Sequence, residues 1–218
     1  MPKRFELLVF DWDGTLMDSA GAIVASIQES CRDLGLPVPE RERASHIIGL
    51  GLKDALAYAV PELPPSDYGK LAERYRHHYL ARDSDLELFP GIREMLAALE
   101  RQGHLLAVAT GKSRAGLERV LEATQLKQYF DSSRCADETR SKPHPAMLQE
   151  LMQELLIEPE ATLMIGDTAH DLQMAVNAGV PALAVSYGAH PRHSLTALNP
   201  LGCVDTPQEL LPWLTKNA

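Results

Sequence analysis

Paired cysteines are missing from this sequence, because its three cysteines, Cys31, Cys135 and Cys203, are widely spaced and form no C-x-x-C motif. This argues against a disulfide framework and against a cysteine-rich zinc site, and it favours reduced thiols. Long hydrophobic runs are missing too. Only about one strand's worth of apolar residues separates the first basic residues from the first aspartates, which is too short for a signal sequence or a membrane span. We therefore expect a soluble cytoplasmic protein without membrane contacts.

Positive charge is also scarce. The chain has 21 basic and 30 acidic residues in a length of 218, for a formal net charge of −9. The densest basic stretch, residues 74–78, is typical of the solvated face of a helix. An acidic protein repels nucleic-acid backbones and anionic lipid, so we expect neither as a partner. Nothing in the composition indicates an oligomeric state.

Short apolar runs alternate with segments whose apolar residues recur at helical spacing, a pattern typical of parallel βαβ units. Expected strands cover residues 5–10, 105–109, 133–136, 162–165 and 181–185. Between the first two lie more than ninety residues, far more than a simple crossover needs. Residues 16–86 contain helical stripes and no convincing strand, so we expect a helical domain there, inserted into a core made of residues 1–15 and 87–218.

Two pairs of aspartates follow two of the expected strands. Asp11-Trp12-Asp13-Gly14-Thr15 comes after the first, and Gly166-Asp167-Thr168-Ala169-His170-Asp171 after the fourth. Either motif alone could form a tight turn, and Asp167 could be the N-cap of the following helix. Together they place four carboxylates at the edge of a parallel sheet where ligands bind. Mg²⁺, a hard cation that prefers oxygen ligands, is the natural partner of such a group.

Cationic and hydroxyl groups follow two further elements of the pattern. Thr110-Gly111-Lys112 comes directly after an apolar run, and Lys142 precedes Pro143, which restricts its backbone. These groups could offset the charge of a phosphoryl group that approaches the carboxylates.

In these four motifs the chain resembles the haloacid dehalogenase superfamily, over essentially its whole length, and most of all the phosphoglycolate phosphatase-like branch. The resemblance implies a Rossmann-like parallel sheet of order 5-4-1-2-3 with an all-helical cap inserted after the first strand. It also implies a Mg²⁺-dependent phosphatase that acts on a small phosphorylated metabolite.

The resemblance further implies a role for each motif residue. Asp11 would attack phosphorus and form an aspartyl-phosphate, while Asp13 would protonate the leaving oxygen and then activate water. Thr110 and Lys142 would bind the phosphoryl oxygens. The metal site would comprise Asp11, Asp13 through its backbone carbonyl, Asp167 and Asp171. On the substrate side we expect Gly111, and in the cap the segment from Gly49 to Lys53, with Gly49 and Lys53 as binding residues.

Some positions depart from the family pattern. Gly111 stands where this branch often has Asn, which leaves the leaving group unidentified among phosphoglycolate, sugar phosphates, nucleotide monophosphates and pyrophosphate. We expect His170 to face solvent. His190 follows Tyr187-Gly188 and could approach the site, but a histidine in a loop more often lies away from it, which is the position we expect.

Other functions on related patterns are disfavoured. A sugar-phosphate mutase of the same superfamily would favour a hydroxyl in the cap segment 49–56, which has none. A dehalogenase or phosphonatase would replace the second aspartate, and this chain retains Asp13. A non-enzymatic receiver-type domain, which accepts phosphate on an aspartate, would lack the long insertion.

Overall fold

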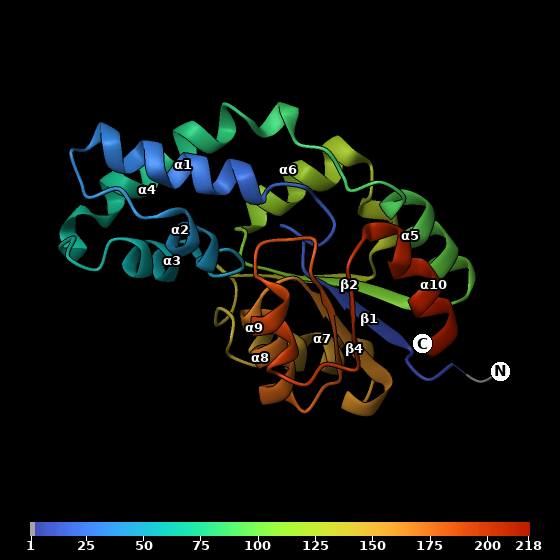
Figure 1. The fold of residues 1–218 in the computed structure, drawn as a ribbon. Helices are drawn as coiled ribbons and strands as arrows, with labels where there is room; N and C mark the ends of the chain where they lie inside the picture. Colours follow the sequence, from blue (N-terminus) through green and yellow to red (C-terminus); the bar gives the residue numbers. More distant parts are fainter. Residues whose placement is uncertain (1–2) are drawn as a thin grey trace.

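The centre of the protein is a parallel sheet, seen in a computed structural model that describes residues 3–218 (Figure 1). Its strands in this range are β1 Leu7–Phe10, β2 Leu105–Thr110, β3 Ser132–Cys135, β4 Thr162–Gly166, β5 Ala182–Val185 and β6 Gly202–Val204. They lie in the order β3-β2-β1-β4-β5-β6, and every neighbouring pair is parallel. The expected order of five strands is therefore confirmed, and β6 extends the sheet at the β5 edge.

Helices cover both faces of the sheet. On one face lie α5 Ile92–Arg101, α6 Arg114–Thr124 and α10 Pro207–Asn217, and on the other α7 Ala146–Leu155, α8 Ala169–Ala178 and α9 Arg192–Thr196 (Figure 1). Successive side chains of a strand point to opposite faces. Accordingly Leu8 and Phe10 of β1 join the first hydrophobic cluster, whereas Leu7 and Val9 join the second. Both faces of the sheet are thus buried, as a parallel sheet requires.

A third hydrophobic cluster lies among the helices inserted between β1 and β2. These are α1 Ala20–Asp33, α2 Arg41–His46, α3 Leu52–Ala59 and α4 Tyr68–Leu80. Ile27, Leu56 and Leu71, from three of these helices, are almost completely buried within it. Figure 1 shows this helical group beyond the carboxyl end of β1. Because it has its own core, we propose that residues 16–86 form a cap domain on a core of residues 1–15 and 87–218.

Short 3-10 helices complete the structure: η1 Pro65–Asp67, η2 Asp83–Asp85, η3 Lys127–Tyr129 and η4 Pro159–Ala161. Within residues 3–218 none of the helices has both the length and the apolar character needed to span a bilayer.

Strand pairing determines where the site can form. β1 lies between β2 and β4, and Phe10 is in register with Val108 on one side and Ile165 on the other. The next residue, Asp11, continues the pairing, because its backbone N–H donates to Ile165 O at 2.9 Å. After β1 the next strand, β2, is added on one side of the sheet, and after β4 the next strand, β5, is added on the other side. Ligands of open parallel sheets bind where the strand order reverses in this way, at the carboxyl ends of the strands.

Candidate active site

Three carboxylates meet at the carboxyl ends of β1 and β4. Asp11 follows β1, Asp167 follows β4, and Asp171 lies in the first turn of α8. All three are 0 % exposed, and one carboxylate oxygen of each lies within 4.8 Å of those of the other two. The two aspartate motifs, more than 150 residues apart in sequence, therefore contribute to one buried group.

Lys142 is the cation buried with these carboxylates. Its Nζ lies 2.5 Å from Asp11 Oδ1 and 2.6 Å from Asp171 Oδ1, and its side chain is 0 % exposed. One ammonium group facing three carboxylates leaves two negative charges without compensation. Asp11 Oδ2 is buried and has no hydrogen-bond partner among the described residues. A buried oxygen of this kind carries a desolvation cost that a ligand can remove. The donor set therefore fits a hard divalent cation.

The pKa values of these groups reflect their burial. Burial raises the pKa of Asp11 well above its ordinary value; Lys142 works against this rise, and the charges of Asp171 and Asp167 add to it. Burial, with the charge of Asp171, raises the pKa of Asp167 to about 7. For Lys142, burial acts to lower the pKa, but Asp11 and Asp171 more than offset it, so the net shift is upward. Crowded carboxylates are thus costly to ionise without a cation.

Asp167 is held from several sides. Thr15 Oγ1 donates to Asp167 Oδ1 at 2.8 Å, and the backbone N–H of Ala189 donates to Oδ2 at 2.7 Å. Gly14 has φ +82°, and a Cβ there would lie 2.2 Å from Asp167 Oδ2. The glycine of the first motif is therefore needed both for its left-handed turn and for close approach to Asp167.

Thr168, and not Asp167, is the N-cap of α8. Thr168 Oγ1 accepts from Asp171 N at 3.3 Å, while Asp171 Oδ2 accepts from Thr168 N at 3.1 Å. This reciprocal capping box fixes Asp171 through Oδ2 and leaves Oδ1 facing Lys142. The N-cap alternative for Asp167 is therefore wrong, and Asp171 takes part in the capping box as its N3 residue.

Asp13 lies apart from the three-carboxylate group and is held by two other side chains. Ser19 Oγ donates to Asp13 Oδ1 at 2.6 Å, and Lys112 Nζ lies 3.0 Å from the same oxygen. Ser19 was not among the residues predicted from the sequence, and Lys112 had no predicted role of its own. The position of Lys112, directly after Thr110-Gly111, was a usable signal. Thr110 itself is completely buried at the end of β2, and its Oγ1 accepts from Lys112 N at 3.2 Å.

Residues 49–51, which we call the cap loop, contact the core closely. The backbone N–H of Gly51 donates to Ser141 Oγ at 2.7 Å. A Cβ on Gly111 would lie 2.5 Å from Leu50 O and 2.7 Å from Gly49 O, so only glycine allows this approach. Gly49 and Gly111, two of the expected substrate-side residues, are thus brought together.

Lys53 is placed differently. It is exposed on the first turn of α3 and, within residues 3–218, has no hydrogen bond or ion pair. Among the described residues it therefore makes no polar contact with the other candidate residues. A role for Lys53 in substrate binding stays a prediction.

Two histidine expectations were wrong. His170 does not face solvent, since its Nε2 lies 2.7 Å from the carbonyl oxygen of His46 in the cap. His190 is 5 % exposed, its ring stacks on that of His46, and its backbone N–H donates to Asp167 O. Burial lowers the pKa of His170, and it lowers that of His190 to about 4, so both rings favour the neutral form. Both histidines pack against His46 of the cap, and sequence periodicity does not reveal such a contact.

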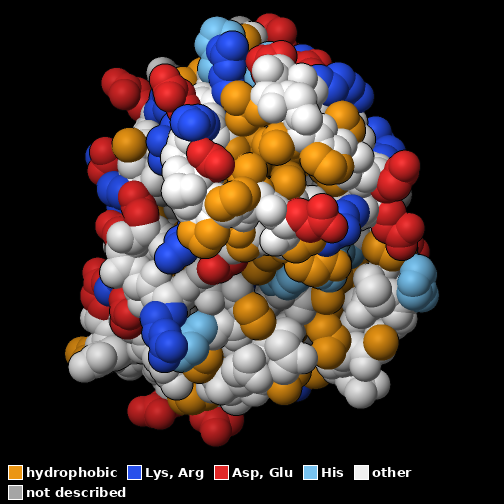
Figure 2. All heavy atoms as spheres, turned by 90° about the vertical axis from the view of Figure 1, so that its left-hand side faces the viewer, with side chains coloured by type: hydrophobic (Ala, Val, Ile, Leu, Met, Phe, Trp, Pro, Cys, Tyr) orange, Lys and Arg blue, Asp and Glu red, His pale blue; other side chains and the backbone are white. Residues whose placement is uncertain are grey.

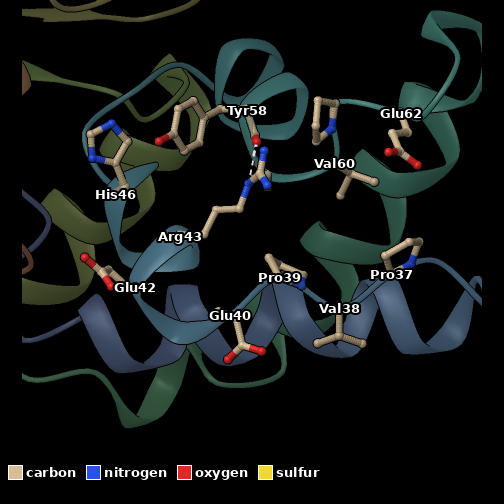
Figure 3. Close-up of a pocket in the computed structure, with 12 residues that line it drawn as sticks. Pro37, Val38, Pro39, Glu40, Glu42, Arg43, His46, Tyr58, Val60 and Glu62 are labelled. Atoms are coloured by element: carbon tan, nitrogen blue, oxygen red, sulfur yellow. Dashed lines mark hydrogen bonds between the residues drawn. The ribbon is translucent and has the colours of Figure 1, made fainter.

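A separate hollow of about 760 Å³ lies in the cap and contains none of the aspartates. Figure 2 shows hydrophobic side chains gathered on this face of the molecule. In Figure 3, Val38 and Pro39 lie on one side of the hollow and Tyr58 on the other, with His46 at one end. Arg43 crosses part of it and donates to Tyr58 O at 3.1 Å. It is distinct from the carboxylate group.

Comparisons with known proteins agree with this geometry. A family model described as haloacid dehalogenase-like hydrolase matches residues 8–185. The chain is 38 % identical over 211 residues to "Probable phosphatase IndB" of Dickeya dadantii, covering 94 % of this chain and 91 % of that protein. It is 33 % identical over 188 residues to "Phosphoglycolate phosphatase" of Agrobacterium fabrum, covering 84 % and 81 %. A solved structure described as a predicted phosphoglycolate phosphatase from Haemophilus somnus 129pt superposes with a TM-score of 0.84 at 25 % identity, covering 98 % and 99 %.

Proposed function

The chain belongs to the haloacid dehalogenase-like hydrolase family, and from this membership we propose that it is a Mg²⁺-dependent phosphatase that hydrolyses a small phosphomonoester. The observation that carries the proposal is the buried Asp11 carboxylate. Its Oδ1 is paired with Lys142, and its Oδ2 has no hydrogen-bond partner among the described residues. That oxygen has lone pairs available for attack on phosphorus.

Asp11 and Asp13 divide the chemistry between them. Asp11 attacks phosphorus as the bond from phosphorus to the leaving oxygen breaks, and Asp13 gives a proton to that oxygen. Water then attacks the aspartyl-phosphate, gives a proton back to Asp13, and releases inorganic phosphate from Asp11. Ser19 and Lys112 hold Asp13 Oδ1, which restricts its carboxylate to one orientation.

The metal site comprises Asp11, the backbone carbonyl of Asp13, Asp167 and Asp171. Three buried carboxylates against one buried lysine support this assignment. When bound, Mg²⁺ supplies positive charge that reduces repulsion between the phosphoryl group and the nucleophile. Thr110 and Lys142 bind phosphoryl oxygens, and Lys142 also neutralises part of the charge on Asp11.

A phosphoglycolate-like substrate is the most specific proposal that the comparisons support, since a relative named phosphoglycolate phosphatase is 33 % identical. Gly111, Gly49 and Lys53 are the proposed substrate-side residues. The close contact of the cap loop with Gly111 supports a small substrate, because it leaves little room at the seam between cap and core. The net charge of −9 supports a free metabolite rather than nucleic acid or anionic lipid as the partner.

The test is phosphate release from phosphoglycolate, sugar phosphates, nucleotide monophosphates and pyrophosphate, with Mg²⁺ and with EDTA. We expect Mg²⁺-dependent release, and a loss of at least about 1,000-fold in kcat for Asp11→Asn. Asp18→Asn, which alters an exposed aspartate of the same segment, is the matched control and should remain active.

A different outcome would favour the alternatives. If no ester releases phosphate but Asp11 carries a stable phosphate that hydroxylamine removes, the protein is instead a phosphomutase or a receiver-type domain.

A further inference from the structure

Lys112 is a nearly buried cation between cap and core, and the proposed chemistry gives it no substrate contact. It follows β2 in the core, and its side chain is 9 % exposed. Its Nζ lies 3.0 Å from Asp13 Oδ1 and donates to Tyr79 Oη of the cap helix α4 at 2.8 Å. The same nitrogen lies 4.8 Å from the centre of the Tyr79 ring. Both the core and the cap therefore hold this ammonium group in place.

The ammonium group of Lys112 has more N–H donors than it has partners. A lysine Nζ carries three N–H bonds, and within residues 3–218 the recorded partners of Lys112 Nζ are Asp13 and the Tyr79 hydroxyl. The tyrosine is held in turn by stacking on Tyr75, with ring centroids 5.8 Å apart. These contacts hold Nζ at the seam and leave its third N–H without a partner among the described residues.

We propose that Lys112 binds a second negatively charged group on the leaving group of the substrate, so that the enzyme selects phosphoesters in which an anion flanks the leaving oxygen. The inference rests on the proposed function, because it takes Asp13 as the proton donor to that oxygen. Lys112 Nζ lies one hydrogen-bond length from Asp13. A carboxylate one carbon away from the leaving oxygen, or a second phosphate attached to it, therefore falls within reach of the same lysine.

Charge explains why such a lysine is needed. A second anion on the substrate approaches Asp13 and is repelled by it, and Lys142 is already committed to Asp11 and Asp171. Lys112 offsets this repulsion in surroundings with little solvent, where charge pairs interact more strongly than in water. Lys53, the other lysine considered for substrate binding, is exposed on α3.

The experiment compares esters of matched size. Phosphoglycolate and 2-hydroxyethyl phosphate differ only in whether a carboxylate or a hydroxymethyl group flanks the leaving end, and pyrophosphate adds a phosphate as the anion. We expect Lys112→Gln to lower kcat/KM for the anionic esters by at least about 10-fold, mainly through KM, because these esters lose a hydrogen bond between charged groups. Activity on 2-hydroxyethyl phosphate should fall by a smaller factor, and this smaller loss measures what Lys112 contributes by holding Asp13. A larger loss in kcat/KM for phosphoglycolate would identify a carboxylate as the bound group, and a larger loss for pyrophosphate would identify a phosphate.

Controls separate substrate recognition from a structural effect. Lys127→Gln alters an exposed lysine outside the site and should leave the preference among esters unchanged. Lys112→Arg keeps the charge and should retain most of the preference. Equal losses on charged and neutral esters with Lys112→Gln would overturn the proposal, because Lys112 would then act only by positioning Asp13. A wild-type enzyme without preference for anionic leaving groups would overturn it too.

Binding measurements keep this inference separate from the proposed function. Calorimetry with Asp11→Asn and Mg²⁺ compares the Kd of phosphoglycolate with that of 2-hydroxyethyl phosphate, with and without Lys112→Gln. If the wild type releases phosphate from none of the esters in the panel, the phosphatase proposal fails. Lys112-dependent preference in binding would still support the anion site, and equal Kd values would reject it.

Discussion

At the scale of single residues, the charge balance of the site depends on Lys142. It is the one cation in contact with Asp11 and Asp171 in the part of the chain that the structure describes, and both carboxylates are completely buried. Removal of one partner from a buried ion pair leaves the other charge uncompensated, which costs more than the pair contributes. Lys142 should therefore matter for stability as well as for catalysis.

We expect Lys142→Met to lower the free energy of unfolding by about 3 kcal/mol at pH 8, measured by urea denaturation in EDTA. Because Asp11 and Asp171 then lack a cation, Mg²⁺ should restore part of the loss. Lys142→Arg, which keeps the charge, should lose less. A loss below about 1 kcal/mol for the methionine variant, the scale of a surface ion pair, would contradict this account.

At the scale of elements, the cap loop and the segment after β2 form the closest contact between cap and core. The approach of the Gly49 and Leu50 carbonyl oxygens to Gly111 leaves no room for a methyl group. These neighbours are backbone atoms, which cannot rotate away as a flexible side chain can. A substitution at Gly111 must therefore move the cap loop away from the core.

We expect Gly111→Ala to raise KM and lower kcat together, by about 10-fold or more in kcat/KM, because the cap closes incompletely over the substrate. Steady-state kinetics on the best ester measures this. Gly69→Ala is the matched control: Gly69 lies in α4 with nothing within 4 Å of an added Cβ, so activity should be retained and stability should rise by up to about 1 kcal/mol. Normal kinetics for Gly111→Ala would show that the cap loop does not contribute to the site.

At the scale of the whole molecule, one buried charge group joins distant parts of the chain. Asp11 follows the first strand, Lys142 precedes α7, and Asp167 follows β4. A cation bound by these carboxylates would bind only the folded protein, because the group does not exist in the unfolded chain. Metal binding should therefore stabilise the entire fold.

We expect the Tm to rise by about 5 °C between EDTA and saturating Mg²⁺, the shift that follows from a metal concentration about 100-fold above its Kd. Differential scanning calorimetry measures it. The shift should be largely lost in Asp167→Asn and kept in Asp18→Asn. An equal shift in all three proteins would mean that Mg²⁺ acts elsewhere.

Local patterns of residues were enough to predict the sheet, the inserted helices and the candidate carboxylates. Alternating apolar runs and helical stripes are local patterns, and the long interval between the first two strands required an insertion whatever its packing. Asp11 and Asp167 were identifiable because each directly follows a buried strand. The strand order came from the family resemblance, and β6 was missed because a strand of three residues shows no period.

The residues that surround those carboxylates are set by the packing of distant elements. Lys112 meets Tyr79, 33 residues earlier in the chain, because the cap folds back over the core. His190 is buried for the same reason, and Gly111 is required because the cap loop approaches it. Such contacts depend on the packing of separate elements, which no local pattern encodes. The carboxylates of the candidate site were therefore predictable from the sequence, whereas the residues that surround and enclose them were not.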